Sequence, residues 1–179
     1  IAENCMLRGA HVTLVNASVS VEPPMFVDVV NVTSAADMAD VVKSKAAEQD
    51  IIIMTAAVAD FCPSHPADEK IKKNDSSYES VIELERTEDI LSYLGAHKAK
   101  GQLICGFSME TQNMLENSKA KLAKKNADMI VANNLKVAGA GFGTDTNVVT
   151  LITADDCTEL EIMDKSCVAA RIMDRLLQM

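Results

Sequence analysis

The chain has 179 residues, of which 48% are hydrophobic and only 3% aromatic, and its formal net charge is −9. This length and hydrophobic content predict a single folded domain with an aliphatic core rather than a disordered chain. The acidic balance argues against non-specific binding to nucleic acid, which requires a basic surface. No apolar run reaches the roughly 18 residues that a membrane-spanning helix needs, so no membrane partner is expected.

The N-terminal residues have the spacing of an amphipathic helix that ends at Gly9, and neither an initiator Met nor a helix N-cap precedes them. We therefore expect residues 1–179 to form one N-terminally truncated domain. Apolar runs and alternating patterns predict strands, in chain order, at 11–15, 27–32, 51–55, 80–84, 102–107, 128–132, 147–153 and 158–163. Helical spacing predicts helices at 35–49 with Ser34 as N-cap, at about 87–98 with Thr87 as N-cap, at 112–125, and at 164 to about 177.

Strands and helices alternate along nearly the whole chain, which is typical of an α/β fold. We predict a Rossmann-like, doubly wound and mainly parallel sheet with helices on both faces and right-handed crossovers. The weak alternation at 80–84 predicts an exposed antiparallel strand, and so a small antiparallel flap. The last two strands are expected to form a hairpin around Ala154–Asp156.

The five cysteines are scattered through the chain at Cys5, Cys62, Cys105, Cys157 and Cys167. They form neither a CxxC pair nor a cysteine–histidine pattern with metal-site spacing. Free thiols are typical of a reducing compartment, and no secretory signal is visible. We therefore expect a cytoplasmic protein with reduced cysteines.

The stretch 50–73 carries the strongest functional signal. Its apolar strand runs into the small residues Ala56 and Ala57 and then to the lone carboxylate of Asp60. Open α/β sheets bind ligands where such strands end, and small side chains let a ligand approach the backbone. Taken alone, Asp60 fits a ligand contact and a simple turn-capping role equally well.

Two clusters of lysines stand out in a chain whose net charge is negative. Lys70, Lys72 and Lys73 follow a Pro-containing loop, and Lys121 and Lys125 are four residues apart on one predicted helix face. Each cluster taken alone is better explained as a solvated cationic surface. Two such clusters in an acidic chain nevertheless favour an anionic, nucleotide-like ligand, because lysines bind phosphate as point charges.

Other features narrow the chemistry without identifying a nucleophile. Phe107 is expected at the end of its strand, where its ring can stack on a base or pack in the core. The loop 139–147 has three glycines but lacks the GxxxxGK[ST] pattern of a Walker loop. The three histidines are far apart in the sequence and support no Ser–His–Asp arrangement.

Five ordered segments, AAVADF, DEKIKK, GFSMET, KLAKKNADMIVANN and GFGTDTNVV, resemble the phosphopantothenoylcysteine synthetase (phosphopantothenate–cysteine ligase) family over nearly the whole chain. In most bacteria this ligase is the C-terminal half of a protein whose N-terminal half is a flavin-dependent decarboxylase. The resemblance implies CTP-dependent ligation of 4'-phosphopantothenate to cysteine through an acyl-cytidylate, in coenzyme A biosynthesis. It also implies Mg²⁺ or Mn²⁺ as the metal, and FMN only where a decarboxylase half is fused.

The resemblance also implies site residues. Lys70, the first lysine of KIKK, matches a lysine of the nucleotide and acyl-transfer site and is the expected catalytic residue. Glu88 to Leu91 match the base-reading turn, although the usual proline of that turn is replaced by Glu88. The implied nucleotide-binding residues are Ala56, Ala57, Asp60, Lys70, Glu88, Asp89, Ile90, Leu91, Phe107, Lys121 and Lys125; metal ligands are not identified.

Further expectations concern what lies around the domain. The resemblance implies that an Asn-His-Ser-Ser-Gly-Lys-Met-Gly-like segment with acyl-substrate contacts precedes Ile1, and without it we expect little ligase activity. The family is dimeric, and Tyr78–Leu84 is the expected homodimer contact. Two alternatives stay open: a non-catalytic nucleotide-binding or dimerisation module, and an NAD(P)-binding oxidoreductase domain, for which no GxGxxG motif is present.

Overall fold

The computed structural model describes residues 1–17, 19, 21–67, 69–70, 81–109, 113–134, 137, 140–141 and 143–179. Its helices are α1 Ala2–Leu7, α2 Ala35–Ala46, α3 Ile90–Ala96, α4 Met114–Lys125 and α5 Lys165–Leu176. Its strands are β1 Thr13–Asn16, β2 Asp28–Asn31, β3 Ile51–Met54, β4 Phe61–Pro63, β5 Leu84–Arg86, β6 Leu103–Met109, β7 Met129–Asn133, β8 Thr146–Asn147, β9 Val149–Ile152, β10 Cys157–Glu159 and β11 Met163–Asp164. None of the described helices is long and apolar enough to cross a membrane.

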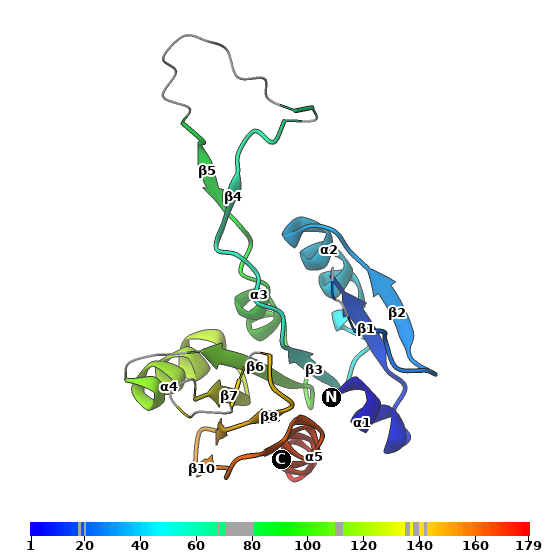
Figure 1. The fold of residues 1–179 in the computed structure, drawn as a ribbon, viewed down its shortest axis with the longest axis vertical. Coiled ribbons are helices and arrows are strands. Elements are labelled where there is room, and N and C mark those ends of the chain that lie inside the picture. The colour runs from blue at the N-terminus through cyan, green and yellow to red at the C-terminus, as the bar shows by residue number, and fades with distance from the viewer. Residues whose placement is uncertain are drawn as a thin grey trace.

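The main sheet has five strands in the order β10–β9–β7–β6–β3. β3, β6 and β7 are parallel neighbours, whereas β9 and β10 continue the sheet in the antiparallel sense. β9 and β10 form the hairpin predicted around 154–156, with Cys157 opposite Ile152. β1 and β2 pair with each other in parallel, as a separate two-stranded sheet (Figure 1).

Helices cover both faces of the sheet, which confirms the predicted α/β class. On one face, Ile172 and Leu176 of α5 are fully buried against β7 and β9 in one hydrophobic cluster. On the other face, Met38 of α2 and Leu94 of α3 pack in a second cluster with Ile104 of β6. A strand enclosed on both sides is expected to read as a continuous apolar run, as β7 does.

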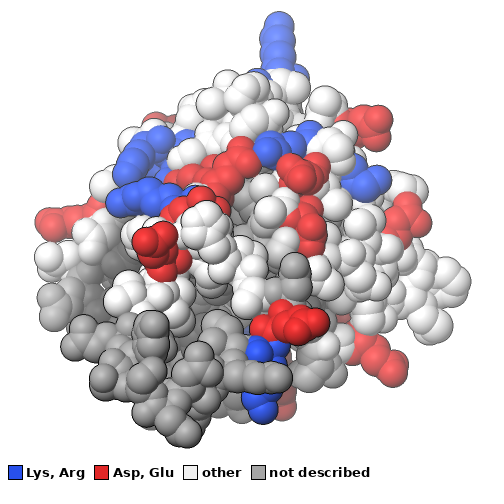
Figure 2. Space-filling view, turned by 90° about the horizontal axis from the view of Figure 1, so that it is seen from above, with Lys and Arg blue, Asp and Glu red and all other residues white. Residues whose placement is uncertain are grey.

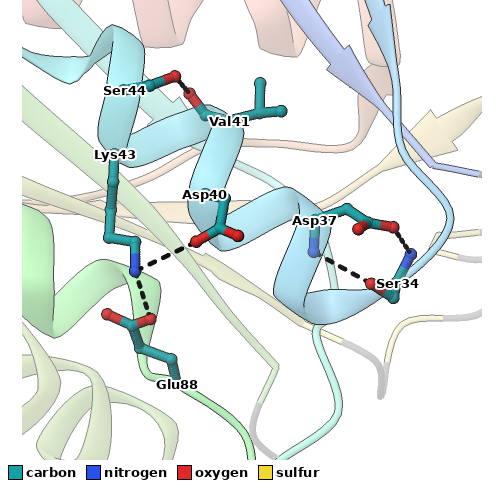
Figure 3. Close-up of polar contacts among 7 residues, drawn as sticks. All are labelled: Ser34, Asp37, Asp40, Val41, Lys43, Ser44 and Glu88. Carbon is teal, nitrogen blue, oxygen red and sulfur yellow. Dashed lines mark hydrogen bonds and ion pairs between the residues drawn. The ribbon is translucent and has the colours of Figure 1, made fainter.

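Local signals at the helix ends explain where the first two helices lie. Gly9 has a φ of +85°, and the N–H groups of Gly9 and Ala10 bond to Met6 O and Cys5 O, so α1 ends in a Schellman motif as predicted. The predicted N-cap of α2 is also confirmed. Ser34 Oγ accepts the Asp37 N–H, and the Asp37 carboxylate accepts the Ser34 N–H, which completes a capping box (Figure 3).

The predicted flap is a hairpin of β4 and β5 that projects from the body of the molecule (Figure 1). Its second strand was placed too early by the sequence pattern: it spans Leu84–Arg86 rather than 80–84, and the residues before Val81 lie outside the described part. The N-cap prediction at Thr87 was wrong. α3 begins at Ile90, and its N-cap is Asp89, because the Asp89 carboxylate accepts the Ser92 N–H at 2.9 Å.

Candidate functional site

A cavity of about 350 Å³ lies beyond the carboxyl end of β3, beside β6 and the start of α3. This volume is in the range of small-molecule sites. Nine of the eleven sequence-predicted binding residues line it, drawn from four separate segments of the chain. They are Ala56, Asp60, Glu88, Asp89, Ile90, Leu91, Phe107, Lys121 and Lys125.

Two predicted residues do not line the cavity. Ala57 follows the lining residue Ala56 but does not itself line the cavity. Lys70 is exposed and lies beyond β4, where the described part of this side of the hairpin ends. Lys72 and Lys73 lie outside the described residues. The structure therefore brings together the predicted base-side and helix residues, while the predicted role of Lys70 stays a prediction.

The loop after β3 is tied to the segment before α3. The Thr87 hydroxyl donates to the Ala59 carbonyl oxygen, and the Thr87 N–H donates to the Asp60 carbonyl oxygen at 3.0 Å. Thr87 therefore fixes the edge of the cavity instead of capping the helix. The Asp60 carboxylate takes no part in these bonds. Asp60 is an exposed residue of the cavity lining.

The N-terminus of α3 carries the most constrained carboxylate of the site. Asp89 caps the helix through Ser92 and pairs with the ammonium of Lys125 from α4. Partial burial alone would raise the pKa of Asp89, but the bonds from Lys125 and the Ser92 N–H outweigh it and hold the pKa below its ordinary value. Lys125 also donates to Ser92 Oγ at 3.0 Å, so its ammonium is held at the helix start.

A cation from outside the cavity compensates the other carboxylate of this turn. Lys43 of α2 contacts Glu88 at 2.6 Å and Asp40 at 3.6 Å (Figure 3). The hydrogen bond that Lys43 donates to Glu88 raises the pKa of Lys43, and the nearby negative charges raise it further. The charge of Glu88 is thus partly neutralised, which makes the turn less repulsive toward an anionic ligand.

The opposite wall combines the carboxyl-terminal part of β6 with the lysines of α4. The Lys121 ammonium donates to the Phe107 carbonyl oxygen at 2.7 Å, so Phe107 of β6 and Lys121 of α4 stand side by side in the lining. Lys121 and Lys125 share a helix face, as their spacing predicts, and both reach the cavity. Two ammonium groups in one lining suit a ligand that carries phosphates, whereas the Phe107 side chain packs against the hydrophobic cluster that contains α5.

Two glycines permit this close packing. A Cβ on Gly106 of β6 would lie 2.7 Å from Leu91 Cδ2. A Cβ on Gly95 of α3 would lie only 1.8 Å from the Lys125 carbonyl oxygen. α3 therefore lies directly against β6 and the end of α4, and this contact sets the distance between Asp89 and Lys125.

The sequence interpretation missed Arg86, which also lines the cavity. Its guanidinium lies 5.3 Å from the centre of the Phe61 ring, at the base of the hairpin. Arg86 contributes a third cation to the lining beside Lys121 and Lys125. Its position two residues before Glu88–Leu91, the turn that the family resemblance assigns to the base, was the signal that could have identified it.

Metal and polyanion binding can be judged from the charges of the described residues. Among them, no group of three or more His, Cys, Asp or Glu side chains is placed to hold a metal ion. On the face seen in Figure 2, acidic and basic side chains lie next to each other rather than in one continuous basic patch among the described residues. The described part of this face therefore offers no continuous basic surface for an extended polyanion.

Comparison with known proteins identifies the family. The DNA/pantothenate metabolism flavoprotein C-terminal domain family matches residues 1–179. The chain is 44% identical to the coenzyme A biosynthesis bifunctional protein CoaBC of Bacillus subtilis over 98% of its own length and 43% of that protein. It is 43% identical to a cysteine/cysteine sulfinic acid decarboxylase of an unknown prokaryotic organism, over 99% of its length and 49% of that protein. The chain thus spans less than half the length of these curated relatives.

A solved structure, that of the C-terminal domain of a CoaBC protein, matches with a TM-score of 0.79 and 39% identity. The match covers 98% of this chain and 77% of that one. Sequence and fold agree over almost the whole chain. It therefore belongs to the DNA/pantothenate metabolism flavoprotein C-terminal domain family.

Proposed function

We propose that this domain is the ligase part of a phosphopantothenoylcysteine synthetase, which joins 4'-phosphopantothenate to cysteine with CTP in coenzyme A biosynthesis. The observation that carries the proposal is the cavity itself. It places Phe107, the start of α3, and three cations within one lining that the family resemblance assigns to a nucleotide. The C-terminal position of the match in CoaBC proteins supports the same assignment.

Cytidine and triphosphate would occupy different parts of the cavity. Phe107 borders the lining through its backbone, and the N–H groups of Ile90 and Leu91 at the start of α3 have no helical partner, so they are donors for polar base atoms. Lys121, Lys125 and Arg86 would meet the phosphates. The Asp60 carboxylate would accept a hydrogen bond from a ribose hydroxyl or a cytosine amino group.

The reaction needs positioning and charge neutralisation more than a protein nucleophile. The carboxylate of 4'-phosphopantothenate attacks the α-phosphorus of CTP, pyrophosphate leaves, and an acyl-cytidylate forms. The amine of cysteine then attacks the acyl carbon, and CMP leaves with the bonding electrons. Cations around the phosphates stabilise the negative charge that develops on the leaving pyrophosphate.

A divalent metal fits this chemistry as a companion of the nucleotide. Mg²⁺ usually keeps several waters and is held by substrate phosphates with one or two carboxylates. Asp60 is the cavity carboxylate for which the described residues contain no salt bridge, and Glu88 and Asp89 are paired with lysines. The metal would lower the charge of the triphosphate when bound.

The activity of a whole bifunctional protein is a separate proposal. The relatives are about twice as long as this chain, and one is named a decarboxylase. We infer that a flavin-dependent decarboxylase half, where fused, supplies that second activity and binds FMN. The projecting hairpin, with Phe61, Ile82 and Leu84 exposed, is the proposed contact of a homodimer.

The direct test is pyrophosphate release, measured with and without each substrate. We expect release only when 4'-phosphopantothenate and CTP are both present, and phosphopantothenoylcysteine after cysteine is added. Release is also compared with that of a fusion in which the segment before the matched region of Bacillus subtilis CoaBC is joined to Ile1, and we expect the fusion to turn over faster. Equal release with ATP, or none with CTP in the fusion, would contradict the proposal.

The two alternatives predict different results. A non-catalytic module would bind CTP and raise the midpoint of thermal unfolding without any release of pyrophosphate. An NAD(P)-binding domain would be stabilised by NADPH rather than by CTP with Mg²⁺. The family assignment favours the ligase over both.

A further inference from the structure

The turn before α3 forms one wall of the cavity, and three of its side chains have separate partners. All residues from 86 to 91 line the cavity. Thr87 bonds to two carbonyl oxygens of the loop after β3, and Asp89 pairs with a lysine of α4. Between them, Glu88 pairs with Lys43 of α2 (Figure 3). Consecutive residues of this turn are therefore tied to three different parts of the fold.

Lys43 holds the turn from outside the cavity. It is not among the described residues that form the lining. Its ammonium lies 2.6 Å from Glu88 Oε2 and 3.6 Å from Asp40 Oδ1 (Figure 3). It also lies 5.4 Å from the centre of the Tyr93 ring of α3, which is within the distance of a cation–π contact. This lysine of α2 thus contacts both the turn and the helix that follows it.

The surroundings of Lys43 limit how far its ammonium can move. The Lys43 side chain is 25% exposed, whereas that of Asp40 is 81% exposed. The two helices that Lys43 joins also share buried contacts, because Met38 of α2 and Ile90 of α3 belong to one hydrophobic cluster. The ammonium therefore has a defined place relative to the turn, and the ion pair draws Glu88 to that place.

A fixed turn affects the choice between nucleotide bases. Under the proposed function, the base lies against this turn. Cytosine and uracil have nearly the same shape, but cytosine has an amino group where uracil has a carbonyl oxygen. Polar groups that are held in place reject the base with the wrong pattern, because one of them is then left unpaired. A turn that can shift loses this discrimination, since a binding geometry must be held within about 0.5 Å.

We propose that Lys43 is a positioning residue, which acts through Glu88 to hold the turn and so determines how strongly the cavity prefers CTP to UTP. The inference rests on the proposed function and adds to it a determinant of selectivity outside the cavity. An exposed ion pair without this role would affect stability alone. The two cases differ in one measurable quantity, the ratio of the affinities for CTP and UTP.

The test compares the dissociation constants of CTP and UTP, both with Mg²⁺, by calorimetric titration. The main variant combines Lys43→Met with Glu88→Gln, because this exchange removes one positive and one negative charge and leaves the net charge of the site unchanged. Its preference for CTP over UTP should fall about fivefold, as expected for the loss of one ion pair. Its affinity for tripolyphosphate, which carries no base, should stay close to that of the wild type.

Single variants identify which residue acts on which. Lys43→Met alone should lower the preference for CTP as much as the double variant does, because either change breaks the same ion pair. Lys43→Arg keeps a cation for Glu88 and should retain the preference. Asp40→Asn is the matched control: it removes only the longer contact of Lys43, at 3.6 Å, and should change neither affinity.

A second measurement needs no ligand. The Thr87 N–H donates to the Asp60 carbonyl oxygen at 3.0 Å, so its exchange with solvent reports opening of the turn. Exchange at Thr87 should be faster in Lys43→Met than in the wild type, and unchanged in Asp40→Asn. Urea unfolding of the same variants shows whether the change is confined to the turn or follows the stability of the whole domain.

Two results would overturn the inference while the proposed function stands. One is a wild type that prefers CTP and a Lys43→Met variant with the same preference and the same exchange at Thr87. The other is a preference that falls in Glu88→Gln but not in Lys43→Met, because Glu88 would then act on the ligand by itself. Failure of the proposed function is recognised in the wild type, which would bind neither nucleotide or both equally, and this result overturns the selectivity role as well.

Discussion

Lys125, in the last turn of α4, forms an ion pair with Asp89, the N-cap of α3. The Asp89 carboxylate thus caps α3 and also holds the Lys125 ammonium in place beside the cavity. The Lys125 side chain is only 13% exposed, which limits how far its ammonium can move. The pair links two walls of the cavity that are 36 residues apart in the sequence.

Replacing Asp89 should separate its two roles. Asp89→Ala removes the cap and the ion pair, and we expect α3 to lose about 1 kcal/mol of stability. Asp89→Asn keeps a side-chain oxygen for the Ser92 N–H and should cost less, because Asn is as good a cap as Asp. Urea unfolding of both variants checks this. If Asn costs as much as Ala, capping is not the dominant role.

The lowered pKa of Asp89 predicts that the free energy of unfolding depends on pH. The folded-state pKa of Asp89 lies below its ordinary value of about 3.9. Its stabilising contribution is therefore complete above that ordinary value and is lost as the pH falls through the lowered pKa. The free energy of unfolding of the wild type should fall more steeply below about pH 5 than that of Asp89→Asn. Parallel curves for the two proteins would contradict this assignment.

Gly95→Ala should destabilise the domain although it raises helix propensity. Alanine is favoured over glycine by about 1 kcal/mol in a helix, yet the new Cβ would lie 1.8 Å from the Lys125 carbonyl oxygen. We expect a net loss of about 1–3 kcal/mol from overpacking. Ala96→Gly, at the exposed next position, is the matched control for propensity alone. A stabilised Gly95→Ala protein, measured by urea unfolding, would mean that α3 and α4 are not in contact there.

Arg86 should contribute to nucleotide affinity. Arg86→Met is expected to weaken CTP binding about fivefold, on the scale of about 1 kcal/mol for an exposed ion pair. Arg86→Lys keeps the charge but changes the contact with the Phe61 ring, so its affinity should lie between the two. Fluorescence titration with a labelled CTP analogue measures this. Unchanged affinity in Arg86→Met would remove Arg86 from the site.

Much of the fold could be predicted because local signals and the tertiary structure agree. The capping box at Ser34, the apolar run of β7 and the hairpin around 154–156 depend on short-range patterns. The start of α3 was missed because Thr87 and Asp89 are both good caps. The contact between Thr87 and the Ala59 carbonyl oxygen, across 28 residues, occupies the Thr87 hydroxyl and leaves capping to Asp89.

The candidate site was predictable only in part, because it too depends on contacts between residues that are far apart in the sequence. Motif resemblance selected Phe107 and Lys121, which the fold brings together in the cavity lining. It gave no indication of Lys43, which reaches Glu88 from α2, since the two residues are 45 positions apart.

Equilibrium binding of CTP with Mg²⁺ to the wild type, Lys121→Met and Lys124→Met tests the central claim most directly. Lys121 lines the cavity, whereas Lys124 is exposed on the same helix and is absent from the lining. Calorimetric titration should give tight binding to the wild type, at least about tenfold weaker binding to Lys121→Met, since bonds to charged groups contribute about 1.5–3 kcal/mol, and no change in Lys124→Met. No binding of CTP to the wild type, or equal losses in the two variants, would contradict the assignment of this cavity to the nucleotide.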